Sequence, residues 1–298
     1  MKKKQKWADQ FNLKRDYYNI FEQRLRDDFQ LETSSIQDYK NEISPIIYTS
    51  ILNKLVKPKP RKIVLSDAFH VPENRLRDWD IVKREIESGA NLEKFLSKDA
   101  VNWNKADFFL FTFGIYHMHL TSKNGVGTNK ELLYFVLKED VLYMILCGDH
   151  SELYSPAELI DIAENNWPKK LFNLSELKNN EYFYTKRLAN DPDSHFNLIN
   201  PAGRLAGVQH SLITSLPQDE LKNVPYKTIS SYNKEVEYLE KLENELVRKY
   251  GGDIELKLDI DFDKRQYIVR VLRDFSIPLY VPFLDESTCS SWLADHCL

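Results

Sequence analysis

The sequence contains no long hydrophobic run. Its longest apolar stretch, FFLFTFGIY at residues 108–116, is far shorter than the roughly 20 residues that cross a bilayer as a helix. The basic residues at positions 1–15 are not followed by an apolar segment of the length that a secretion signal requires. We therefore expect a cytoplasmic protein that has no membrane partner.

Cysteine is scarce, and the common nucleophile motifs are missing. Cys147, Cys289 and Cys297 cannot all pair within one molecule, which agrees with a reducing compartment. The chain has no G-x-S-x-G motif, and KNGVGTNK at residues 123–130 does not match a phosphate-binding glycine fingerprint. The spacing of the last two cysteines with His296 matches no standard zinc pattern. We therefore expect no cofactor and no bound metal.

An excess of basic residues is also missing. The chain has 41 Lys and Arg residues against 45 Asp and Glu residues, a net charge of -4. This balance provides no general attraction to nucleic acid, so RNA binding needs a local basic patch. Residues 1–15 and 54–62 are two such patches, and the alternative is that both are simply solvated. The candidate RNA-binding residues of the second patch are Lys57, Lys59, Arg61 and Lys62.

Hydrophobic periodicity predicts an α+β protein with three consecutive regions. Residues 1–100 are predicted to be a helical N-terminal region, and residues 101–216 a domain with a central antiparallel sheet. Residues 217–298 are predicted to be a C-terminal helix followed by a β-hairpin.

Several element boundaries are also predicted. A long helix is expected at residues 36–56, a short strand at residues 62–66, and a helix that ends at Gly89. A further helix should begin at Pro156, because proline suits the first helical position and Ser155 can cap it.

The most informative segment is FGIYHMHL at residues 113–120, where a single residue separates two histidines. In a β-strand, alternation places His117 and His119 on one face and Met118 on the other. Two more strand-prone runs follow after short joins, so the three strands should form an antiparallel meander. The first and third strands then end at the same edge of the sheet, about 10 Å apart across the middle strand, which brings His119 near His150.

Two lysines in the predicted loop at residues 121–130 add positive charge at this edge. Such a cluster suits metal-independent RNA cleavage. One imidazole takes the proton of the ribose 2′-hydroxyl, a second gives a proton to the leaving 5′-oxygen, and a lysine stabilises charge on phosphorus. The candidate catalytic residues are His117, His119, His150, Lys123 and Lys130.

Two other interpretations stay open. The strand histidines, with Asp149 and His150, are also a plausible set of ligands for a divalent ion, which would make the protein a metal-dependent phosphoesterase or nuclease. Alternatively, the histidines are structural and the protein is a non-enzymatic binding or regulatory protein. Nuclease assays with and without a chelator separate these possibilities.

Residues 92–168 resemble a group of bacterial proteins that share a W-G-I-x-H-x-H-L run, a hairpin, an Asp-His dipeptide, a short helix and a terminal N-W-P. The corresponding segments here are GIYHMHL, GDH and NNWP, with Phe113 in place of the tryptophan. The arrangement is similar to ribonuclease toxins of the RelE and barnase-like type. The resemblance implies a prokaryotic source, a toxin or anti-phage defence role, an antitoxin or defence-system partner protein, and functional roles for His117, His119 and His150.

Overall fold

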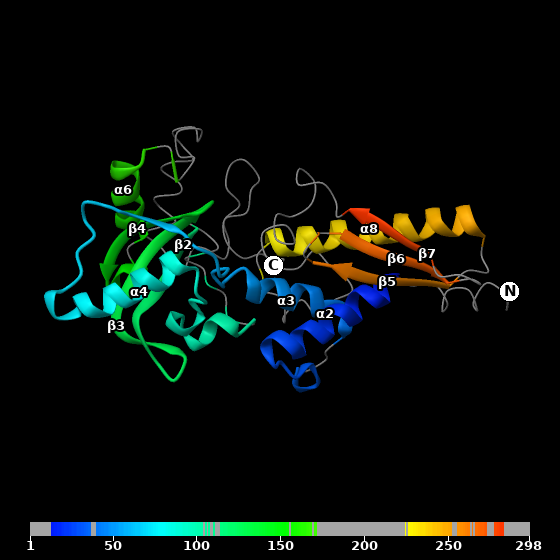
Figure 1. Ribbon diagram of the computed structural model, residues 1–298, viewed down its shortest axis with the longest axis horizontal. Coiled ribbons are helices and arrows are strands. Elements are labelled where there is room, and N and C mark those ends of the chain that lie inside the picture. Colours follow the sequence, from blue (N-terminus) through cyan, green and yellow to red (C-terminus); the bar gives the residue numbers. More distant parts are fainter. Residues whose placement is uncertain are drawn as a thin grey trace. The chain divides into compact units, whose positions relative to one another are not determined.

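Figure 1 shows a computed structural model of the chain. It describes residues 13–36, 40–103, 105, 107, 110, 114–154, 156–168, 170–171, 224, 226–251, 255–262, 264, 266–272 and 277–282. The fold class is α+β, as predicted. In the part of the chain that is described, no helix is both long enough and apolar enough to cross a membrane.

Contacts divide the chain into two units. Unit 1 is Met1–Asn53 with Ser211–Leu298, and unit 2 is Lys54–His210. This division differs from the three consecutive regions expected, because the first helices pack against elements from the other end of the sequence. The helical N-terminal region is therefore shared between the two units.

In unit 1, helix α2 (Leu13–Phe29) has one apolar face that points into the core. The buried residues recur every four positions, as the helical period requires, and they are Leu13, Tyr17, Phe21 and Leu25. Helix α3 (Ser44–Leu52) is shorter than the predicted helix because Pro45 lies in its first turn, where proline is tolerated. Short 3-10 turns precede it, η1 (Thr33–Ser35) and η2 (Asn41–Ile43).

Helix α8 (Tyr226–Tyr250) and a three-stranded antiparallel sheet complete unit 1. The strands are β5 (Glu255–Asp261), β6 (Gln266–Leu272) and β7 (Ile277–Pro282), in that order. The predicted helix and hairpin are thus confirmed, with one additional strand. β5 alternates as its sequence predicts, with Leu256, Leu258 and Ile260 buried between exposed charged residues.

Unit 2 contains a four-stranded sheet in the order β1-β4-β3-β2. The strands are β1 (Lys62–Leu65), β2 (Ile115–Lys123), β3 (Val126–Lys138) and β4 (Val141–Gly148). β2, β3 and β4 form the predicted antiparallel meander. β1 adds to β4 in parallel, so the sheet is mixed rather than purely antiparallel.

Both faces of this sheet are covered (Figure 1). One core lies beside helix α4 (Leu76–Ser88). The 3-10 turns that flank this helix in the sequence are η3 (Glu73–Arg75), η4 (Glu93–Phe95) and η5 (Lys98–Val101). Helix α6 (Pro156–Asn166), preceded by η6 (His150–Tyr154), covers the other core. The α4 core includes Trp79, Val82, Ile86, Met118, Leu133, Phe135 and Met144. The α6 core includes Ile115, Leu132, Tyr134, Ile145, Leu159, Ile160 and Ala163.

The segment between β2 and β3 corrects the sequence prediction. The expected loop at residues 121–130 consists mostly of strand, and the turn itself is Asn124–Gly125, both with positive φ (53° and 77°). An Asn-Gly pair suits the tight hairpin turn whose two central residues have positive φ, so the strands continue almost to each other. Lys123 and Lys130 are therefore strand residues.

Candidate functional site

The two strand histidines lie on the α6 side of the sheet. His117 pairs with Tyr134 and His119 with Leu132, and both of these partners belong to the α6 core. Directly opposite residues of an antiparallel pair share a face. Met118 instead packs in the α4 core, so the predicted alternation is confirmed.

His119 and His150 form a side-by-side imidazole pair. Leu132 lies between His119 and Gly148, the last residue of β4, so the two strand ends meet as predicted. The ring centroids are 5.7 Å apart, with 50° between the planes. His119 is only 8% exposed, whereas His150 is exposed. The pair therefore consists of one buried imidazole and one exposed imidazole.

The turn that carries His150 is held by hydrogen bonds to Asp149. The Asp149 N–H donates to Oε2 of Glu152 (2.7 Å), and its carboxylate accepts from the N–H and hydroxyl of Ser151 (2.7 and 2.6 Å). The Tyr134 hydroxyl donates to the Asp149 carbonyl oxygen (2.6 Å). The hydrogen bonds from Ser151, with the nearby His150, lower the pKa of the Asp149 carboxyl.

Gly148 lies beneath the Glu152 side chain, whose flexible end would have to shift to make room for a larger residue. A Cβ at this position would lie 2.7–2.9 Å from the Glu152 carboxyl group, which sits directly over it. The GDH segment thus combines a small residue, a turn-capping carboxylate and an exposed imidazole.

His117 faces Asp107, a residue that the sequence analysis did not identify. Nδ1 of His117 is 3.8 Å from Oδ2 of Asp107, and the His117 ring lies 6.3 Å from the Tyr134 ring. The other oxygen of Asp107 accepts the N–H of Leu110 (2.9 Å). The segment before β2 thus supplies a carboxylate to the first strand histidine, and no periodicity in the sequence indicates this contact.

A buried lysine holds the chain that leads to Asp107. Lys54 is 5% exposed, and its Nζ donates to three backbone carbonyl oxygens at 2.5–3.1 Å. These acceptors belong to Asp99, Asn102 and Lys105. Burial lowers the pKa of Lys54 to about 8, although Asp107 and Asp99 act in the opposite direction.

The hairpin closes against His119 through Gly127. The Gly127 N–H donates to the carbonyl oxygen of Leu96 (2.8 Å), next to η4. A Cβ at Gly127 would lie 2.5 Å from Cδ2 of His119 and closer still to the carbonyl oxygen of Phe95. Only glycine allows this approach, so Gly127 helps to enclose the buried imidazole.

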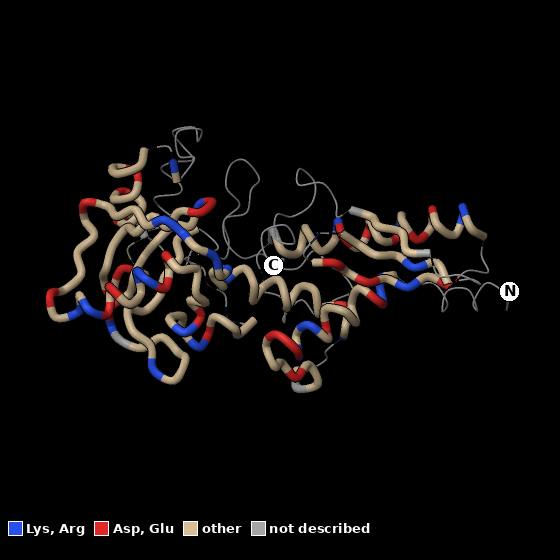
Figure 2. Tube along the Cα trace, in the orientation of Figure 1, with Lys and Arg blue, Asp and Glu red and all other residues tan. Residues whose placement is uncertain are grey.

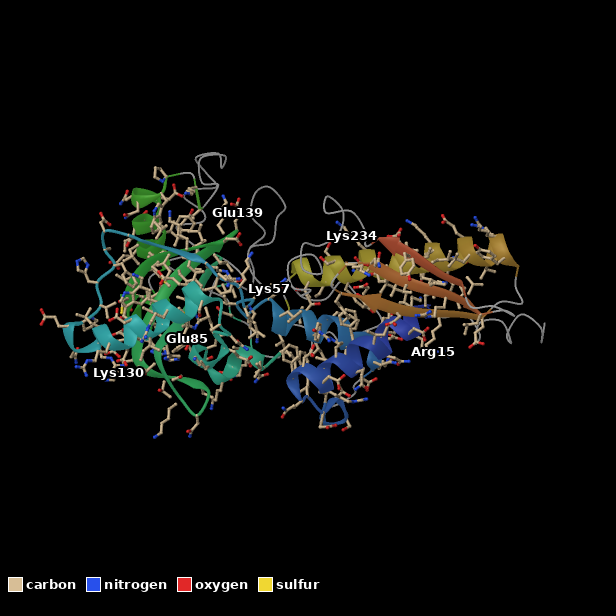
Figure 3. The ribbon with its side chains drawn as sticks, viewed as in Figure 1. Arg15, Lys57, Glu85, Lys130, Glu139 and Lys234 are labelled. Atoms are coloured by element: carbon tan, nitrogen blue, oxygen red, sulfur yellow. The ribbon has the colours of Figure 1, made fainter. Side chains whose placement is uncertain are left out.

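The structure separates the two candidate lysines. Lys123 pairs with Val126 beside the turn, four residues beyond His119, which is about 13 Å along the strand. Lys130 lies in β3 two residues before Leu132, the cross-strand partner of His119, and is exposed (Figure 3). Lys123 therefore does not lie beside the histidines as expected, because the strands extend through the predicted loop, whereas Lys130 stays a candidate.

The basic segment before β1 is visible as a blue stretch in Figure 2, but its charges are not all available. Arg61 is 5% exposed, and burial lowers the pKa of its guanidinium. Lys59 forms an ion pair with Asp140. Lys57 is partly exposed and Lys62 is exposed (Lys57 is labelled in Figure 3). Arg61 is therefore not available for the predicted RNA contact, because its side chain is buried, and the contact of the three lysines stays a prediction.

A metal site finds no support among the described residues, where no three His, Cys, Asp or Glu side chains are grouped so that they could hold an ion. Cys289, His296 and Cys297 lie outside the described residues, as do most of the basic residues at positions 1–15. Among the basic residues at positions 1–15, Lys14 is described, and it forms an ion pair with Glu240 in unit 1.

The N-W-P segment has a structural role. The Asn166 side-chain amide exchanges two hydrogen bonds with Asp67, donating to its carboxylate (2.7 Å) and accepting its N–H (3.0 Å). The Trp167 ring packs edge-on against Tyr143 at 5.2 Å. These contacts fasten the end of α6 to β4 and to the segment after β1.

Comparisons with protein-family models, with curated proteins and with solved structures found no match. The resemblance of residues 92–168 to the bacterial W-G-I-x-H-x-H-L group stays a prediction. The function of the site is therefore inferred from its geometry, in which His119 and His150 are in contact at the edge of the sheet.

Proposed function

We propose that unit 2 is a metal-independent endoribonuclease whose acid and base are His119 and His150. The observation that carries this proposal is the 5.7 Å separation of the two rings, one buried and one exposed. Imidazoles serve as both proton donors and proton acceptors near neutral pH, and no external metal is needed for this chemistry.

The burial difference suggests which ring has which role. We assign the buried ring, His119, as the general base and the exposed ring, His150, as the general acid. His119 accepts the proton of the ribose 2′-hydroxyl as that oxygen attacks phosphorus. His150 gives its proton to the 5′-oxygen as the P–O bond to that oxygen breaks. The products are a 2′,3′-cyclic phosphate end and a 5′-hydroxyl end, and water resets the two protons.

Lys130 is the candidate that stabilises the added charge on phosphorus, since Lys123 lies too far along the hairpin. The exposed cation Lys62, with Lys57, remains a candidate for contacts to the RNA backbone. The resemblance supports an action in the cytoplasm as a toxin or anti-phage protein, with an antitoxin or defence-system partner protein that restrains it.

The test is cleavage of a defined RNA oligonucleotide with and without a chelator. Wild-type protein should form 2′,3′-cyclic phosphate ends at an undiminished rate in the chelator, with a bell-shaped pH profile near neutrality. His119→Ala and His150→Ala should each lower kcat by about 10²- to 10⁴-fold. His70→Ala replaces an exposed histidine between β1 and α4 and should leave the rate unchanged.

Each rival interpretation has its own result. Cleavage that a chelator abolishes and zinc or manganese restores would favour a metal-dependent nuclease on the same residues. Full activity in the His119→Ala/His150→Ala double variant would make the histidines structural. Inactivity of the wild type on RNA and DNA would favour a binding or regulatory protein.

A further inference from the structure

His150 is an exposed residue at the start of a short 3-10 turn, a place where side chains are usually mobile. A proton donor has to be held within about 0.5 Å of its working position to be effective. An effective proton donor at His150 therefore requires a contact that fixes the turn against the sheet.

Asp149 makes hydrogen bonds of two kinds, and one of them provides this contact. The bonds to Ser151 and Glu152 close the turn upon itself. The bond from the Tyr134 hydroxyl instead joins the turn to β3, the strand beside β2 and β4. This bond therefore ties the backbone just before His150 to the strand that lies opposite His119.

Tyr134 is suited to be a fixed point. Its side chain is completely buried in the α6 core, and its ring also lies beside the His117 ring. Burial, together with the nearby Glu152 and Asp149 carboxylates, raises the pKa of Tyr134, so the hydroxyl keeps its proton and remains a donor.

We propose that Tyr134 is the positioning residue for His150: its hydroxyl, bonded to the Asp149 carbonyl oxygen, sets the direction of the exposed imidazole toward His119. This inference rests on the proposed ribonuclease function for its kinetic consequence. Its structural consequence, an ordered His150, does not depend on any substrate.

The test compares Tyr134→Phe with Tyr143→Phe. Both variants remove one hydroxyl from a buried ring of the same sheet, but the Tyr143 ring packs against Trp167 at the other end of α6. In Tyr134→Phe, backbone order parameters of residues 149–151 should fall from about 0.85 to below about 0.6. In the same variant kcat for RNA should fall about 10- to 100-fold with KM unchanged, because a misplaced proton donor slows chemistry without weakening binding.

Tyr143→Phe should change neither quantity. Unchanged order parameters in Tyr134→Phe would overturn the proposal, whatever happens to kcat, and so would an equal loss in the control. If wild-type protein does not cleave RNA, the ribonuclease function fails, and the order parameters still decide whether Tyr134 positions His150.

Discussion

The replacement Gly127→Ala tests whether the hairpin is closed against His119 and η4 as described. The added Cβ would lie 2.5 Å from Cδ2 of His119 and 2.8 Å from the carbonyl oxygen of Leu96, whereas real Cβ atoms stay beyond 3.0 Å. Two of its three near neighbours are backbone oxygens, of Phe95 and Leu96, which cannot rotate away as a flexible side chain can. The hairpin and the η4 segment must therefore move apart.

The expected cost follows from two contributions. Inserting a methyl group into a well-packed site typically costs about 1–3 kcal/mol. Separating the segments also weakens the 2.8 Å hydrogen bond from Gly127 to Leu96, worth about 0.5–1.5 kcal/mol. We expect the free energy of unfolding of unit 2 to fall by about 1.5–4.5 kcal/mol.

The assay is urea unfolding followed by tryptophan fluorescence, since Trp79 and Trp103 are largely buried in unit 2. The matched control is Gly125→Ala in the same hairpin, where a Cβ has open space and only the positive φ of 77° is strained. That strain costs about 1–2 kcal/mol. A loss in Gly127→Ala no larger than in Gly125→Ala would refute the close approach.

Three further results are expected. Asn166→Ala removes both hydrogen bonds to Asp67 and should lower the unfolding free energy by about 1–2 kcal/mol; an unchanged urea midpoint would contradict the clamp. Because burial lowers the pKa of Lys54 from 10.5 to about 8, the unfolded state binds more protons between these values, and stability should rise with pH there by up to about 3 kcal/mol. Lys54→Met should abolish that rise. Burial raises the pKa of Cys147 from 9.0 to about 11. In a variant whose other two cysteines are replaced by serine, alkylation of Cys147 in the folded protein at pH 8 should therefore be about 100-fold slower than that of an ordinary thiol. Equal alkylation rates would contradict this expectation.

Much of the secondary structure was predictable because it depends on neighbouring residues. The helix that ends at Gly89, the helix that begins at Pro156 and the alternation of β5 all appear as the sequence predicts. Helical and strand periods are properties of the backbone, and proline and glycine act within a turn of their own position. The pairing of His119 with His150 was also predictable, because short connections force antiparallel neighbours.

Other features depend on segments that are distant in the sequence. Arg61 looks like an exposed cation in its basic run, yet tertiary packing buries it. Asp107 faces His117 at the end of a segment whose carbonyl groups bind Lys54, a residue about 50 positions earlier in the chain. No local pattern indicates that Gly127 approaches the carbonyl oxygens beside η4.

The amino-acid sequence alone therefore specifies the α+β class, most element boundaries, and the shared face and edge of the histidines, since these follow from backbone periodicity and short connections. Folding in three dimensions decides which histidine is buried, which carboxylate faces His117, which tyrosine binds the backbone before His150, and how the ends of the chain combine in unit 1. These outcomes depend on the burial of side chains by partners far away in sequence, and burial is a property of the packed molecule rather than of any single segment.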